Sequence, residues 1–213
     1  LFETSAMSKS IKILPLMIKK DGIVIMSCVL ANASRMDDYL QISFFESKEY
    51  NKEAFDLTYN KAVEMSKLWS ANKISASLNI HVNYGLGFLA DSYDKNQSFG
   101  LAHNDEFIHR YFNDYGFNPI HMVNFYKDMD KEFTLISNRM REKLNKRYTR
   151  RCADFSNMEE EAKVYTRINN DAFRDHLFYY ERVEEEDLEL FKDFKLLLKK
   201  ENLLFVEKDG VEV

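Results

Sequence analysis

Apolar and polar positions near the start of the chain follow the pattern of a β-hairpin. Two apolar runs, over 11–18 and 23–30, are separated by Asp21-Gly22. Both central residues of a tight two-residue turn need positive φ, so Asp-Gly between two such runs predicts a hairpin. Pro15 interrupts the first run and cannot donate a ladder hydrogen bond, which places that strand at a sheet edge or at a bulge.

A long helix is predicted after a third strand over 40–46. It runs from Asn51 to about Lys73, and its core-facing residues lie on one arc about 100° wide, the width of a buried stripe. These residues are Ala54, Phe55, Thr58, Ala62, Met65 and Trp69. We interpret Trp69 as a core residue, and an alternating run over 74–80 predicts a fourth strand.

The middle of the chain predicts less regular structure. Residues 81–100 contain three glycines and are expected to form a loop. A helix over 104–115 follows and ends at Gly116. Alternation predicts a strand over 121–126, and a basic helix is expected over 133–148.

This basic helix leads into a strongly charged segment. Seven Lys or Arg lie between Arg139 and Arg151, against the single Glu142. We interpret the segment as a solvent-exposed connector. A contact with phosphate or RNA is the alternative, and the lack of an aromatic RNA-binding motif argues against it.

Two more helices and a second hairpin are predicted in the last third of the chain. Ser156 and Glu159 have the spacing of a capping box at the start of one helix. Three consecutive glutamates over 184–186 suit the positive N-terminus of the next helix. A strand over 203–206 then leads into a second Asp-Gly turn.

The second hairpin repeats the first. Residues 16–23 and 204–211 share three apolar positions, two polar ones, Asp-Gly and a final apolar position. Hairpins can share this pattern by chance, but its recurrence indicates an internal duplication.

Composition narrows the class of protein. The 213 residues are 45% hydrophobic and 31% charged, and the net charge of -5 argues against nucleic acids and anionic membranes as partners. With no apolar run long enough to span a membrane and no signal-peptide pattern, a cytoplasmic protein with no membrane partner is expected. Two cysteines are too few for a disulfide framework, and the five histidines are scattered, so no metal site is predicted.

Spaced motifs in the first half of the chain resemble a known family. They cover 78–91, 98–100, Asn104, 109–111 and 116–117. In this order they are similar to a bacterial group of the GNAT N-acetyltransferase superfamily.

A second set of motifs, over 168–173 and on to the second hairpin, is similar to the start of another GNAT copy. The two resemblances together imply a tandem GNAT-like protein.

The resemblance implies an α/β fold, with a mixed, mostly antiparallel, twisted sheet flanked by helices and acetyl-CoA bound where two strands splay. It divides the chain into a GNAT-like domain over 1–130, a basic helical connector over 131–151 and the start of a second copy over 152–213. Because the chain lacks an initial Met and stops within a predicted strand, we expect an internal fragment. The elements over 148–213 would complete the sheet of the first copy, either in cis or by exchange in a homodimer.

In the family, a glycine-rich turn after the fourth strand cradles the CoA pyrophosphate with backbone N–H groups. The matching residues here, Ser47 to Asn51, contain no glycine and add the carboxylate of Glu49. Ser47 and Asn51 are the candidate cofactor-binding residues, for an acetyl-CoA that no phosphate-loop motif in this chain supports. The equivalent turn of the second copy is expected beyond Val213.

By position in the family, Glu46 is the candidate general base and Tyr111 the candidate acid that reprotonates the CoA thiolate. His81, Tyr84 and Asn104 are the candidate substrate-binding residues. Each has a structural alternative: an exposed strand-end carboxylate, a half-buried aromatic ring, or a core or surface polar group.

The predicted function is that of an acyl-CoA-dependent N-acyltransferase, or a fragment of one, acting on a small-molecule or peptide amine. The alternative is a non-catalytic GNAT-like domain that binds a ligand or a partner. The missing glycine turn favours the alternative for the first copy.

Overall fold

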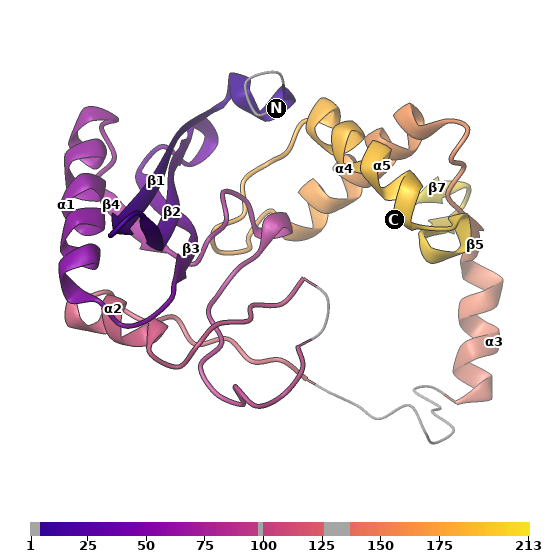
Figure 1. Ribbon diagram of the computed structural model, residues 1–213. Helices are drawn as coiled ribbons and strands as arrows, with labels where there is room; N and C mark the ends of the chain where they lie inside the picture. Colours follow the sequence, from indigo (N-terminus) through magenta and orange to yellow (C-terminus); the bar gives the residue numbers. More distant parts are fainter. Residues whose placement is uncertain (1–4, 98–99, 126–136) are drawn as a thin grey trace. The chain divides into compact units, whose positions relative to one another are not determined.

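The computed structural model describes residues 5–97, 100–125 and 137–213 (Figure 1). The chain divides into two compact units. The N-terminal unit comprises Phe2–Met122 with Asp175–Tyr180, and the C-terminal unit comprises Val123–Arg174 with Glu181–Val213.

The described part of the N-terminal unit forms a sheet in the order β1-β2-β3-β4. β1, β2 and β3 are antiparallel, and β3 and β4 are parallel, so the fold is α/β with a mixed, mostly antiparallel sheet flanked by helices, as predicted. The elements are η2 (Ala6–Lys9), β1 (Ile11–Lys20), β2 (Ile23–Ala33), η3 (Ser34–Met36), β3 (Tyr39–Ser47), α1 (Lys52–Leu68), β4 (Lys73–Ala76), η4 (Val82–Tyr84) and α2 (Ile108–Asp114).

The first predicted hairpin is confirmed. Asp21 and Gly22 have φ of 50° and 79°, the paired positive values that a tight two-residue turn requires. Pro15 lies in β1, an edge strand that pairs with β2 alone in this sheet, so its missing N–H leaves no ladder bond unmade.

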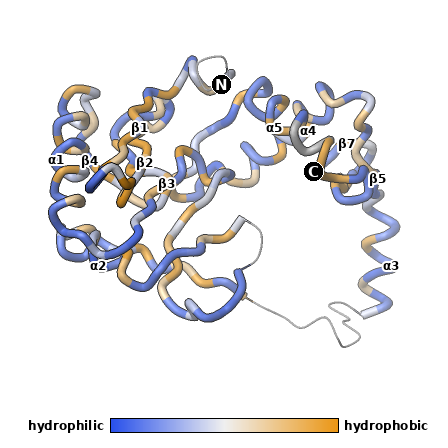
Figure 2. The backbone as a smooth tube through the Cα atoms, viewed as in Figure 1, coloured by the Kyte–Doolittle hydropathy of each residue, from blue (hydrophilic) through white to orange (hydrophobic). Residues whose placement is uncertain are grey.

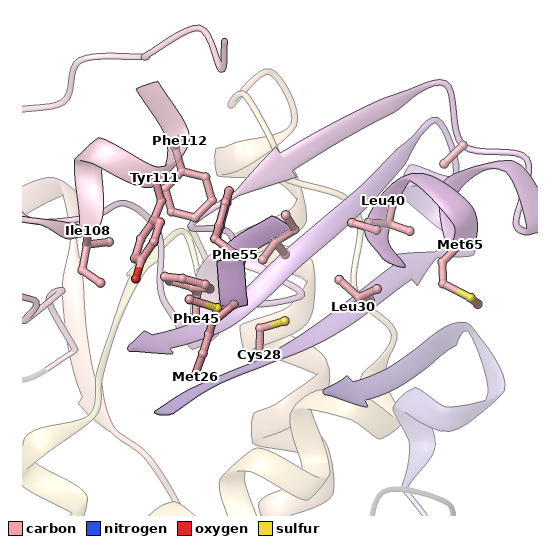
Figure 3. Packing of buried hydrophobic residues seen from close by; sticks show 14 residues of the cluster. Met26, Cys28, Leu30, Leu40, Phe45, Phe55, Met65, Ile108, Tyr111 and Phe112 are labelled. Carbon is pink, nitrogen blue, oxygen red and sulfur yellow. The ribbon is translucent and has the colours of Figure 1, made fainter. Parts of the chain in front are cut away.

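The core of the N-terminal unit lies between α1 and one face of the sheet. Figure 3 shows Phe55 of α1 and the α2 residues Tyr111 and Phe112 packed over Phe45 of β3. The predicted helix stripe is buried except at Trp69, which caps the helix and packs against the core as a partly buried ring. The buried strand residues of this cluster are Met26, Cys28, Leu30, Leu40, Ile42 and Phe45.

The described part of the C-terminal unit forms an antiparallel sheet in the order β5-β6-β7, with three α-helices. Its second hairpin turn also has two positive φ values, 54° at Asp209 and 78° at Gly210, as predicted. The elements are α3 (Asn138–Arg147), β5 (Thr149–Cys152), α4 (Met158–Phe173), α5 (Glu184–Leu197), η5 (Lys200–Asn202), β6 (Leu204–Lys208) and β7 (Val211–Glu212).

Two predicted elements end early, for a backbone reason. α1 stops at Leu68 instead of Lys73, because Ser70 has a left-handed φ of 61°. β4 stops at Ala76, and Ser77 follows with φ of 66°, which an extended strand cannot accommodate.

The strand predicted over 121–126 is wrong: residues 121–125 form no strand, and Tyr126 lies outside the described residues. Alternation alone does not make a strand, because the backbone groups also need a ladder partner. Ser98 and Phe99 of the family motifs also lie outside the described residues.

The basic segment differs from its prediction as well. Residues 133–136 of the predicted helix lie outside the described residues, and α3 is exposed along its length (blue in Figure 2). Residues 149–151, expected within the helical connector, form β5 together with Cys152, because they pair with β6 far along the chain.

The predicted capping box is not formed. α4 begins one residue later than expected, after Asn157, and the Ser156 hydroxyl instead donates to the Asp154 carboxylate at 2.6 Å. That bond, together with the Ser156 N–H on the same carboxylate, makes a local turn that competes with capping.

Residues 203–206 do not complete the sheet of the first copy in cis. β6, which holds all but the first of them, lies between β5 and β7 and pairs with these two strands. That prediction is therefore wrong, whereas exchange between two copies stays a prediction.

Candidate functional site

The candidate site centres on the turn between β3 and α1, over 47–51. Asn51 is the N-cap of α1, and its Oδ1 accepts the Ala54 N–H at 3.0 Å. Its carbonyl accepts the Phe55 N–H at 3.1 Å. The start of the helix is thus capped by the chain itself, with a residue type favoured there.

The hydroxyl of Tyr111, a residue of α2, holds this turn by hydrogen bonds. It accepts the Asn51 N–H at 2.6 Å and donates to the Glu49 carbonyl at 2.7 Å. The Ser47 hydroxyl lies 3.1 Å from it. Tyr111 is only 1% exposed, so these bonds are shielded from water. Three predicted site residues, Ser47, Asn51 and Tyr111, are therefore joined in one polar cluster around the buried Tyr111.

The ring of Tyr111 is held as firmly as its hydroxyl. It stacks on Phe55 at a centroid distance of 4.7 Å and on Tyr50 at 4.8 Å, so it lies between two aromatic rings. The Tyr50 hydroxyl donates to the Asp114 carboxylate, which raises the pKa of Tyr50, and the Arg110 guanidinium lies over its ring. The turn and α2 are fixed together by packing as well as by hydrogen bonds.

Glu46 is not part of this cluster. It is exposed and pairs with Ser27 across the β2–β3 ladder, between the buried Phe45 and the half-buried Ser47. Successive side chains of a strand point to opposite faces, so Glu46 faces away from the side on which Phe45 meets Tyr111. The candidate base and the candidate acid thus lie on opposite faces of the sheet.

The β3–β4 ladder ends at the pair Ile42–Ala76, where β4 itself ends, and side chains continue the contact between the two segments. The Ser43 hydroxyl donates to the Leu78 carbonyl at 2.6 Å and accepts the Ile80 N–H at 3.2 Å. Asn79 Oδ1 accepts the N–H of Phe44 at 2.7 Å. Sequence reasoning missed Ser43 and Asn79, since nothing local marks a side chain that replaces a ladder bond.

His81 is a core residue of the N-terminal unit. Its Nδ1 accepts the Asn83 N–H at 3.2 Å, and its Nε2 lies 3.1 Å from the Tyr180 carbonyl, to which it donates. A backbone N–H can only donate and a carbonyl can only accept, so the ring is neutral with its proton on Nε2. With 0% exposure, His81 has no access to a solvent-borne substrate.

Asn104 braces the loop that precedes α2. Its Oδ1 accepts the Leu89 N–H at 2.6 Å and its Nδ2 donates to the Leu89 carbonyl at 3.2 Å, as a neighbouring strand would. The helix predicted from Asn104 begins instead at Ile108. Tyr84 lies partly buried in η4, and its carbonyl accepts from the Asn79 side chain.

The described surface beside α2 is more acidic than basic. A shallow hollow beside α2 is lined by Asp105, Glu106, Phe107 and Arg110, two carboxylates against one guanidinium. Among the residues that the structure describes, no three His, Cys, Asp or Glu side chains come together as a metal site needs. No described helix is long and apolar enough to span a membrane.

Comparison with known proteins adds no relative. The chain matches no protein-family model, and searches of curated proteins and of solved structures gave no significant match. The GNAT resemblance therefore stays a prediction that rests on the spaced motifs.

Proposed function

We propose that the N-terminal unit is a non-catalytic GNAT-like domain that binds a partner or ligand, and that it does not bind acyl-CoA at residues 47–51. One observation carries the proposal. The Tyr111 hydroxyl holds the Asn51 N–H and the Glu49 carbonyl and closes the turn that would have to receive a pyrophosphate.

A phosphate cradle needs several free backbone N–H groups aimed at one point and a close approach of the ligand. Here the N–H groups of Asn51, Ala54 and Phe55 all have partners within the protein. Opening the turn would leave the buried Tyr111 hydroxyl without its partners in the turn, at a cost of about 1–3 kcal/mol. The exposed Glu49 carboxylate adds charge of the wrong sign.

Acyl transfer from acetyl-CoA to a small-molecule or peptide amine is the second candidate. The resemblance associates splayed strands with acetyl-CoA, and this candidate is favoured here by the end of the β3–β4 ladder at Ile42–Ala76 while β3 continues to the exposed Glu46. In that case Glu46 would act alone as the base, because Tyr111 faces the other side of the sheet.

Calorimetry with acetyl-CoA separates the two candidates. We expect no binding heat from the wild-type chain at millimolar ligand. The double variant Glu49→Gly/Tyr111→Phe, which opens the turn and removes its carboxylate, tests whether closure is what blocks the ligand. Glu46→Gln is the matched control, because it also removes a carboxylate next to the turn but leaves the turn closed. Micromolar binding by the wild type would overturn the proposal.

A further inference from the structure

The β5–β6–β7 sheet has two faces of opposite character. Across its ladders Arg150 pairs with Val206, Cys152 with Leu204, and Val211 with Lys208. Directly paired residues share a face, and alternate residues of a strand share it too.

One face, the inner face, is packed and charge-compensated. Phe205 is 5% exposed, with the Arg151 guanidinium over its ring. Arg151 also bonds the buried Glu161 of α4 at 2.6 Å and Glu212 at 2.8 Å. This guanidinium holds the pKa of the Glu212 carboxyl below its usual value. The two acidic strand residues of the hairpin, Glu207 and Glu212, are thus both directed to the inner face.

The other face, here the outer face, is aliphatic and open. Its four large apolar side chains are 46–56% exposed: Leu204 52%, Val206 46%, Val211 55% and Val213 56%. Cys152 and Arg150 are exposed beside them, and Lys208 is half-buried. The charged strand residues on this face, Arg150 of β5 and Lys208 of β6, are both basic, because the strand carboxylates of Glu207 and Glu212 point the other way.

The N-terminal unit shows what covers such a face. Its first hairpin has the same sequence pattern, in which Leu16, Ile18 and Ile25 stand where Leu204, Val206 and Val213 stand in the second. Those three side chains pack against the core that α1 closes with Ala54, Phe55, Ala62 and Met65. The same apolar positions are therefore partly buried against a helix-covered core in one hairpin and open in the other.

We propose that the outer face of β5–β6–β7 binds an amphipathic helix of a partner protein, one whose apolar stripe is bordered by Asp or Glu. Exposed aliphatic patches of this kind mark interaction sites. The helix follows from the precedent of α1, and the acidic border follows from Arg150 and Lys208. Two copies docking through this face would bring these cations together, which disfavours a dimer. The inference goes beyond the proposed function and concerns the other unit.

The test uses the full chain and two labelled synthetic helices of equal length, each with a Leu/Ala stripe. One has Glu along its borders and the other has Lys. In fluorescence anisotropy we expect the Glu peptide to bind at least 10-fold more tightly than the Lys peptide. Val206→Glu, on the exposed face, should weaken the Glu peptide by at least 10-fold. Met17→Glu, at an exposed position of the other hairpin, is the matched control and should change nothing.

Other outcomes overturn the proposal. Equal affinity for the two peptides would contradict the acidic border of the proposed partner helix. No binding of either peptide would contradict the proposal that a helix binds this face. Sedimentation velocity that finds a wild-type dimer, lost in Val206→Glu, assigns the face to self-association. Binding to phosphatidylserine vesicles that depends on Val206, without peptide binding, assigns it to an anionic membrane.

Discussion

The two Asp-Gly hairpins of this chain share one sequence pattern and bury opposite faces. In the first, Leu16 and Ile18 pack against the core and Met17 between them is 64% exposed. In the second, Phe205 at the position of Met17 is 5% exposed, whereas Leu204 and Val206 are open.

The difference separates what the hairpin sequence itself specifies, its register, from what the neighbouring helices determine, the face that is buried. The Asp-Gly turn sets the register, because both turn residues take positive φ in each copy. Both faces of each hairpin carry apolar residues, so the helix that the chain supplies decides which face is buried. α1 covers the Ile18 face of one hairpin. α4 lies on the Phe205 face of the other, where its Glu161 accepts a hydrogen bond from Arg151.

Truncating the two central residues of the hairpins should give the largest contrast. Phe205→Ala removes a buried ring, and we expect about 3–5 kcal/mol of destabilisation of the C-terminal unit. Met17→Ala removes an exposed side chain and should change stability by less than about 0.5 kcal/mol. Hydrogen exchange of peptides from α4 and from β1 measures the two units separately. Equal effects at both positions would contradict the opposite burial of the two hairpins.

The closed turn of the N-terminal unit gives the next largest effect. Tyr111→Phe keeps the stacked ring but leaves the Asn51 N–H and the Glu49 carbonyl without the hydroxyl, so we expect a loss of about 1–3 kcal/mol. Trp69, the single Trp of the chain, lies in this unit and reports its denaturant unfolding by fluorescence. Tyr50→Phe, which loses a bond at the surface, is the control and should cost less than Tyr111→Phe. A neutral Tyr111→Phe would show that the hydroxyl does not hold the turn.

Local chemistry made much of the fold predictable from the sequence. Both hairpins follow from Asp-Gly between apolar runs, and α1 follows from its buried stripe and Asn51 cap. β5 was missed because Thr149–Cys152 is polar and basic, and only its pairing with β6 makes it a strand. The strand predicted over 121–126 failed for the converse reason, since its pattern has no ladder partner.

The candidate site was predictable only in part. Ser47, Asn51 and Tyr111 came from the family resemblance, and the structure joins them by hydrogen bonds that span some 60 residues of sequence. No local pattern encodes such a distant contact. Strict alternation over 40–46 would place Glu46 on the face of Leu40 and Ile42, which is the core face. A bulge at Phe44, with φ of 49°, puts Phe45 on the core face and turns Glu46 away from it, and no pattern in the sequence marks this bulge.

The two cysteines repeat the contrast between buried and open faces. Cys28 lies under α1, and burial raises the pKa of its thiol to about 12, from 9.0. The unfolded chain therefore loses this proton first, so stability should fall by about 1.4 kcal/mol per pH unit between pH 9 and 12 and should not change below pH 9 on this account. Comparing wild type with Cys28→Ala by urea unfolding at pH 8 and pH 10 isolates the effect.

A thiol reagent at pH 8 should modify the exposed Cys152 and spare Cys28, and rapid modification of both would contradict the burial of Cys28.

The smallest predicted difference in stability is between substitutions at Ile18 and Val206, which are equivalent positions on the same face of the two hairpins. Ile18→Thr places a hydroxyl against the core under α1 and should cost roughly 1 kcal/mol, because the group is partly desolvated. Val206→Thr keeps a β-branched side chain on an open face, so its effect on the isolated chain should stay within about 0.5 kcal/mol. If a helix binds the outer face, Val206→Thr should make the free energy of binding to the Glu-bordered peptide less favourable and leave the stability of the free chain nearly unchanged. A substitution silent in the free chain and costly in the complex would distinguish a binding face from a surface that is merely apolar.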